Sequence, residues 1–263
     1  MKFYFSVLFL LLVIFSSCKK KEEESDARYS SSYKVISVVN GGTIKGTVKS
    51  DANQKYPMTI KTQKDQDVCG ASHPNLSIPN PNGAVPNCII TLDHITEGKD
   101  FPKQEYSLDQ RGCDFHPHVQ IVKLGLPVVM INSDHALHNY HIFYNGETVV
   151  NEAQPEDAPP REVDLKQKGL HTVTCDVHPW MKGYIWMAEH PYCTLCDSSG
   201  AFVLTDVPPG KYKLILWRDN WNLEEAKNTA GVIESYTWGK DFSKEQEITV
   251  VAGKDVIVDF VLP

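Results

Sequence analysis

Residues 169–181 are GLHTVTCDVHPWM, a short run with strand character that leads directly into a loop bearing three metal-ligand side chains. Within this loop Cys175, His178 and Met181 follow one another at intervals of three residues. A thiolate, an imidazole and a weak thioether are ligands that copper accepts in a trigonal site with a long axial bond, provided that a second imidazole comes from elsewhere. The stretch therefore predicts a β-protein with one mononuclear copper site.

The rest of the chain also has strand character. Short alternating runs separated by Gly, Pro, Asn and Asp recur along its 263 residues, and no long stretch has an apolar period of 3.6. Residues 223–227 are one short helix candidate, and 72–86, crowded with Pro and Asn, are expected to be a loop. The fold class is predicted to be all-β, with strands at 43–49, 87–92, 119–124, 127–132, 169–175, 184–188, 201–204, 212–217, 247–251 and 255–261.

The second imidazole is predicted to come from His138, which is followed by Asn139 just beyond the apolar strand at 127–132. This His-Asn pair, with the later Cys-x-x-His loop, resembles plastocyanin-like and azurin-like cupredoxins over about 104–191. The resemblance implies a Greek-key β-barrel, copper held by His138, Cys175, His178 and Met181, and a hydrogen bond from Asn139 across to the ligand loop. Met181 follows His178 by three positions, a tighter spacing than in plastocyanin.

Two further patterns lie far apart in the chain. Residues 42–48 (GTIKGTV) resemble the first strand of carboxypeptidase regulatory-like, immunoglobulin-like β-sandwiches, and 197–212 resemble the second half of the same domains. We expect one discontinuous sandwich, residues 35–104 plus 191–263, with a cupredoxin module at 105–190 inserted; three consecutive β-domains are the alternative. The combination resembles uncharacterised bacterial secreted proteins, some labelled methylamine utilisation proteins, which share the phrases at 109–113 and 117–119.

The N-terminus has the pattern of an export signal. Residues 3–15 are nearly all apolar, and Ser-Ser-Cys follows at 16–18. The run is shorter than the roughly 20 residues that span a bilayer as a helix. We expect a lipoprotein signal peptide at 1–17, acylation of Cys18, and a charged tether at 18–34, which would anchor the protein to a membrane at the cell envelope or periplasm.

Seven cysteines in an exported chain raise the question of disulfides. Cys69 with Cys113, and Cys193 with Cys196, are the expected pairs. Cys88 is left in an apolar strand. The sequence alone does not fix this connectivity.

Other histidines are weaker ligand candidates. His141 lies three residues after His138, which on a strand points it to the opposite face. His116 and His118 share a strand face, so His118 could join a second metal site or approach the first, although a structural role is preferred. His135 is an alternate ligand.

Composition limits the function classes. A net charge of −7 with no basic stripe argues against nucleic acid as a partner. The preferred function is a copper-binding one-electron carrier that works with a redox partner protein. Copper storage or delivery, with a copper donor or acceptor, is an alternative, as is a non-redox module whose Trp217, Trp221 and Trp238 would stack on sugars. No enzyme activity is expected, because no nucleophile with a nearby base stands out.

Overall fold

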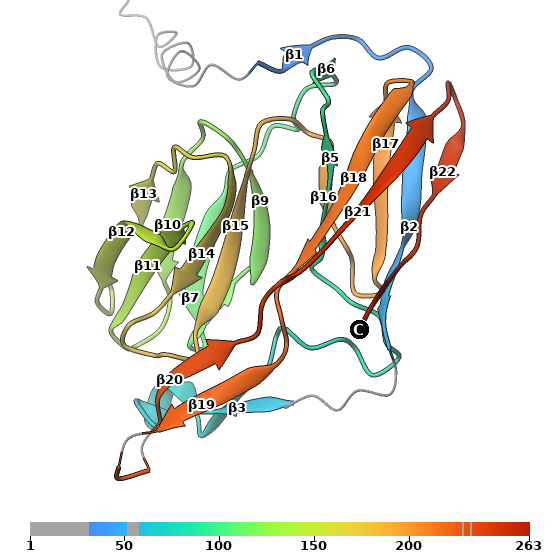
Figure 1. Ribbon diagram of the computed structural model, residues 1–263. Helices are drawn as coiled ribbons and strands as arrows, with labels where there is room; N and C mark the ends of the chain where they lie inside the picture. The colour runs from blue at the N-terminus through green and yellow to red at the C-terminus, as the bar shows by residue number, and fades with distance from the viewer. Residues whose placement is uncertain (1–31, 52–57, 228, 232) are drawn as a thin grey trace, which may run out of the picture.

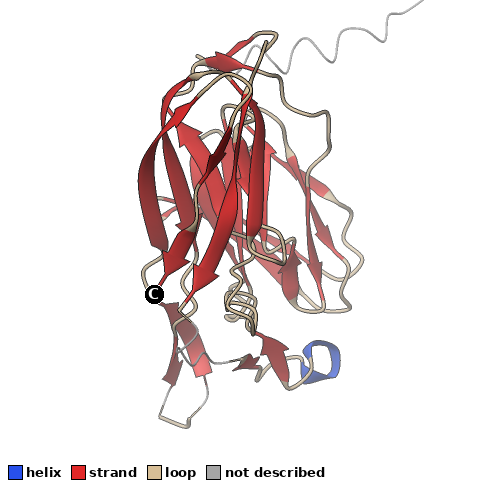
Figure 2. Ribbon diagram, turned by 90° about the vertical axis from the view of Figure 1, so that its right-hand side faces the viewer, coloured by secondary structure: helices blue, strands red, loops and turns tan. Residues whose placement is uncertain are grey.

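The protein is all-β. A computed structural model describes residues 32–51, 58–227, 229–231 and 233–263 (Figure 1). The expected signal peptide and the lipidation residue Cys18 lie outside these residues. Within them, helix is confined to the single turn α2 (Gln66–Cys69), seen near the lower end of the molecule in Figure 2.

The first of two sandwiches, here called the flanking sandwich, is built from both ends of the chain. One sheet has the order β16-β5-β18-β21, and the other has the order β17-β2-β22, with β23 also paired to β2. Its apolar core includes Ile44, Leu92, Leu214 and Phe260, which come from both sheets. Its strands are β2 (Gly42–Ser50), β5 (Ile89–Asp93), β16 (Cys193–Leu195), β17 (Ala201–Val207), β18 (Gly210–Arg218), β21 (Phe242–Val250), β22 (Asp255–Ile257) and β23 (Phe260–Leu262).

The second, here called the inserted sandwich, follows β5 and precedes β16 in the chain. Its sheets have the orders β13-β10-β7-β8 and β12-β11-β14-β15-β9, so its strands form two separate sheets. Phe115, Met130, Tyr140 and Ile185 are among the fully buried side chains between them. Its strands are β7 (Ser107–Arg111), β8 (Asp114–His116), β9 (Val119–Lys123), β10 (Val128–Asn132), β11 (His138–Tyr144), β12 (Glu147–Gln154), β13 (Arg161–Val163), β14 (Gly169–Thr174) and β15 (Lys182–Ala188).

The pairing of β2 distinguishes an insertion from consecutive domains. If β2 did not pair with the C-terminal strands, the proposal that the cupredoxin-like module is inserted into one discontinuous sandwich would be contradicted. Instead β2 pairs antiparallel with β17 and parallel with β22 and β23. The two sandwiches meet at a small apolar cluster of Ile89, Val119, Tyr184 and Trp217, to which each sandwich contributes two residues.

Short accessory elements lie outside the two sandwiches: β1 (Lys34–Val35), β6 (Glu97–Gly98), β3 (Thr59–Lys61), β4 (Ser72–Pro74), β19 (Leu223–Lys227) and β20 (Ile233–Trp238). The prediction of a helix at Leu223–Lys227 is wrong, because this segment pairs with β20 as a hairpin. The hairpin contacts the β3 segment, since the Tyr236 hydroxyl donates to the Lys61 carbonyl, and Figure 1 shows both at one end of the inserted sandwich. The described helix is far too short to cross a membrane.

Candidate metal centre

Two neighbouring strands bring the predicted ligands together. β11 begins at His138, and β14 ends at Thr174, directly before Cys175. The two strands pair antiparallel, with His141 opposite Thr174. The beginning of β11 and the end of β14 therefore lie next to each other at the same end of the sheet. The loop 175–181 then turns back into β15, and its turn is closed by a 3.0 Å hydrogen bond from the Met181 N–H to the His178 carbonyl.

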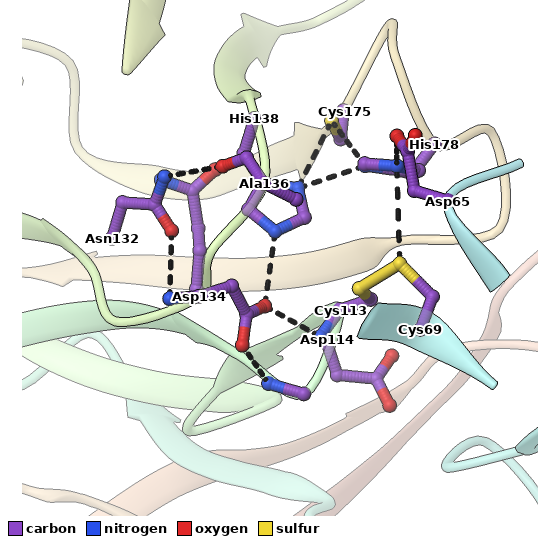
Figure 3. Close-up of polar contacts among 12 residues, drawn as sticks. Asp65, Cys69, Cys113, Asp114, Asn132, Asp134, Ala136, His138, Cys175 and His178 are labelled. Atoms are coloured by element: carbon purple, nitrogen blue, oxygen red, sulfur yellow. Dashed lines mark hydrogen bonds and ion pairs between the residues drawn. A yellow bond between two sulfur atoms is a disulfide. The ribbon is translucent and has the colours of Figure 1, made fainter. Parts of the chain in front are cut away.

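Three candidate ligand atoms, two from this loop and one from the start of β11, converge here (Figure 3). The Sγ of Cys175 lies 3.9 Å from Nδ1 of His138 and 3.8 Å from Nδ1 of His178, and the two Nδ1 atoms are 2.8 Å apart. Both histidines are 0% exposed and Cys175 is 2% exposed. The cluster is therefore shielded from water.

The spacing of these atoms fits a transition-metal ion. A point in their plane about 2.0 Å from both nitrogens lies about 2.2 Å from the sulfur, close to the usual lengths of metal–nitrogen and metal–thiolate bonds. Two imidazoles and one thiolate in a trigonal arrangement form the donor set of mononuclear copper electron-transfer sites. The residues present therefore fit a copper ion.

Each histidine is held by a carboxylate on its other edge. Nε2 of His138 lies 3.0 Å from Asp134 Oδ2, and Nε2 of His178 lies 2.9 Å from Asp65 Oδ2. An Nε2–H that donates to a carboxylate leaves the Nδ1 lone pair directed toward the cluster. In the neutral form of each ring, which is the form that binds a metal, the carboxylates thus favour the required tautomer, and they hold the ring in the required orientation.

Electrostatics within the cluster favour a thiolate. Burial raises the pKa of Cys175, but hydrogen bonds from His138 and His178 outweigh burial and lower it to about 6. Burial lowers the pKa of His138, but its hydrogen bonds to Asp134 and Cys175 outweigh this and raise it to about 9. Near neutral pH the metal-free site therefore holds a Cys175 thiolate beside a His138 imidazolium.

Met181 and Trp180 belong to the buried core that also contains Cys175. Met181 is 1% exposed and packs in the same apolar core as Cys175. The indole Nε1–H of Trp180 donates to the Cys113 carbonyl at 3.1 Å, and its ring lies 5.0 Å from that of His178. The tryptophan thus packs against His178, a candidate ligand, from inside the core.

Asn139 makes the contact across to the ligand loop that the sequence resemblance implies. Its Oδ1 accepts the backbone N–H of Asp176 at 2.6 Å, and its Nδ2 donates to the Asp176 carboxylate at 3.0 Å. Asn139, the residue after His138, therefore holds Asp176, the residue after Cys175, in place.

The weaker histidine candidates lie elsewhere. His118 contacts Asp219 at 3.1 Å and the Lys182 carbonyl at 3.0 Å, at the junction of the two sandwiches, so it is not part of the cluster. His141 contacts Asp176 and Thr148, and it is likewise not a co-ligand. The alternate ligand His135 is exposed and pairs with Glu156 at 2.6 Å.

The cysteines divide differently from the expectation. Cys69 and Cys113 form a disulfide, which confirms the predicted pair. Cys193 and Cys196 are free thiols, so the pair expected between them is wrong. The backbone N–H of Cys196 instead donates to the carbonyl of the buried Cys88, at 2.9 Å.

Two site residues were missed by sequence reasoning. Asp134 lies in the loop before His138, four residues from it, and its position between a strand and a ligand was a usable signal. Asp65 is 113 residues from His178 in the chain, and nothing local to either residue indicates their contact.

Comparisons with known proteins give weak likenesses only. No protein-family model matches the chain, and no curated protein matches it. Among solved structures, it is similar to a Cu-containing nitrite reductase from Thermus scotoductus SA-01, with 20% identity and a TM-score of 0.30 over 34% of this chain and 24% of that one. It therefore spans about a quarter of the nitrite reductase.

Two smaller proteins are matched over most of their length. A purple cupredoxin from Nitrosopumilus maritimus is 18% identical, with a TM-score of 0.29, over 32% of this chain and 100% of that one. Amicyanin from Paracoccus versutus is 17% identical, with a TM-score of 0.30, over 34% of this chain and 86% of that one.

Proposed function

We propose that this chain is a copper-binding one-electron carrier of the cell envelope, with one copper held by His138, Cys175, His178 and Met181. The observation that carries the proposal is the convergence of one thiolate and two Nδ1 atoms in a buried cluster. Copper bound by such a set alternates between Cu(I) and Cu(II), which supplies one-electron transfer. The chain's own residues hold the donors in a fixed arrangement and keep water out.

The proposal includes membrane attachment through an acylated Cys18 and a redox partner protein. A Cys18→Ala variant expressed in a bacterium with lipoprotein processing should move from the membrane fraction to the soluble fraction. Retention of that variant at the membrane would contradict acylation as the anchor.

Two alternatives predict different behaviour. Copper storage or delivery needs a metal that exchanges readily, whereas the ligand side chains here are 0 to 2% exposed, which favours retention. A sugar-stacking surface is disfavoured, because Trp217 is 8% exposed and Trp221 is 0% exposed. An enzyme would need a path for its substrate to reach the metal. The burial of the four proposed ligand side chains therefore favours a carrier over an enzyme as well.

The test is a visible and electron paramagnetic resonance spectrum of the protein from Lys19 onward, loaded with Cu(II). We expect an intense thiolate-to-copper charge-transfer band that is lost in Cys175→Ser. The matched control is Cys193→Ser, which removes another free cysteine outside the cluster and should keep the band. A wild-type protein that binds no copper, or whose spectrum Cys175→Ser leaves unchanged, refutes the proposal.

A further inference from the structure

One carboxylate of the candidate site comes from outside the inserted sandwich. Asp65 lies between β3 and β4, in a segment that precedes the inserted strands in the chain. Its Oδ2 is 2.9 Å from Nε2 of His178, and its side chain is 41% exposed whereas that of His178 is 0% exposed. Asp65 thus contacts a buried ligand on one side and solvent on the other.

Asp65 has an unusual backbone conformation, and its side chain does not cap the helix that follows it. Asp65 occupies the N-cap position of α2, with φ 48° and ψ 42°, a left-handed conformation that non-glycine residues adopt at a cost. An aspartate at an N-cap ordinarily accepts a backbone N–H of the first helical turn. Here its side chain makes no such bond, and its carboxylate is directed at His178 instead.

The segment is fastened to the inserted sandwich close to Asp65. The disulfide joins Cys69, at the end of α2, to Cys113, and His73 in β4 pairs with Asp114 at 3.0 Å. The His73 ring also stacks on Trp180, with 5.9 Å between the ring centroids. These contacts hold the segment that carries Asp65 against the ligand loop, as Figure 3 shows for the disulfide and Asp65.

We propose that Asp65 is a positioning residue for His178, and that the copper site is complete only when the β3–β4 segment covers it. The carboxylate holds the Nε2–H, so Nδ1 faces the ion. Its negative charge also stabilises Cu(II) more than Cu(I), because the oxidised ion carries the higher charge. This inference rests on the proposed function.

The test compares Asp65→Asn with Asp67→Asn in the full chain. Asp67 is an exposed carboxylate in the first turn of the same helix, so it controls for the lost charge. Asp65→Asn should weaken Cu(II) binding about 10- to 100-fold, the usual effect of removing such a partner of a ligand. Each tenfold loss specific to Cu(II) raises the reduction potential by about 59 mV. Asp65→Glu keeps the charge and should recover most of the wild-type potential.

A metal-free readout separates this inference from the proposed function. In the wild-type protein without metal, nitrogen-15 NMR should show the His178 Nε2–H protected from exchange, and Asp65→Asn, which replaces a charged acceptor with a weaker neutral one, should reduce that protection. Equal potentials and equal exchange in Asp65→Asn and Asp67→Asn overturn the inference even if copper binds. If the wild type forms no thiolate–copper band, the proposed function fails and the role of Asp65 toward copper fails with it. The exchange data would then report only whether Asp65 orients His178. If Asp65→Asn does not fold, Asp65→Glu is compared directly with wild type, and an unchanged potential together with unchanged exchange overturns the inference.

Discussion

Replacing Asp134 with asparagine should change the protonation of His138, a proposed copper ligand, while keeping the size and shape of the side chain at position 134. Asp134 accepts backbone N–H groups from Gly112 at 2.6 Å and Cys113 at 2.7 Å, besides its contact with His138. Burial alone would lower the pKa of His138, and the Asp134 carboxylate is the first of the contacts that reverse this effect. We therefore expect Asp134→Asn to lower the pKa of His138.

The pKa of about 9 reports the net effect of burial, Asp134 and Cys175 on His138, so it sets an overall scale and not the share of Asp134 alone. The difference from the ordinary histidine value of about 6.5 corresponds to roughly 3 kcal/mol in favour of the imidazolium. A metal must displace this proton, so the apparent affinity should rise about tenfold per pH unit up to about pH 9. In Asp134→Asn the rise should end at a lower pH.

Two measurements check this prediction. Nitrogen-15 NMR of the metal-free protein follows the His138 ring directly, which matters because His138 and Cys175 titrate as an interacting pair. The affinity for Co²⁺, which does not oxidise thiols, is then measured against pH. Asp164→Asn, at an exposed carboxylate, controls for the change in net charge. A wild-type His138 that titrates near 6.5, or an unchanged pKa in Asp134→Asn, would refute the reasoning.

Three further predictions concern the stability of the metal-free protein, measured by urea unfolding. Replacing Cys69 and Cys113 with serine opens a loop between residues 44 apart in the chain and should cost about 4 kcal/mol by chain entropy; a loss below about 1 kcal/mol would count against that account. Trp180→Phe leaves the buried Cys113 carbonyl without its donor and should cost about 1–3 kcal/mol, so an unchanged midpoint would contradict the importance of this bond. In wild type, the raised pKa of His138 makes stability fall as pH rises from about 6.5 to about 9, and the lowered pKa of Cys175 makes it rise from about 6 to about 9. The two trends oppose each other. Cys175→Ser removes the rise and also removes one of the two contacts that raise the pKa of His138, so it should expose the smaller fall that Asp134 supports; a variant that gained stability over this range would show that the pair is wrongly described.

The ligand loop was predictable because its information is local. Cys175, His178 and Met181 lie within seven consecutive residues, and His138 follows an apolar strand at a position where strand ends meet. Alternation along the chain also indicated the all-β class. Asp65 was not predictable, because its contact with His178 depends on how a distant segment folds over the site.

Two predictions made from short stretches of sequence, the Cys193–Cys196 disulfide and the helix at 223–227, are wrong because most or all of each stretch is a strand. Cys193 begins β16 and Cys196 follows its end, and residues three apart on an extended strand point to opposite faces, so this spacing does not close a disulfide. Residues 223–227 are too few to form a stable helix alone, and pairing with β20 made them a strand instead.

The partners of β2 impose an order on folding during synthesis. All strands of the inserted sandwich have been made once Ala188 is added, whereas β2 must wait for β17, β22 and β23, the last of which ends at Leu262. Because domains generally fold as units while the chain grows, the ligand loop can form before the flanking sandwich closes. During that interval β2 has open edges that can pair with another chain.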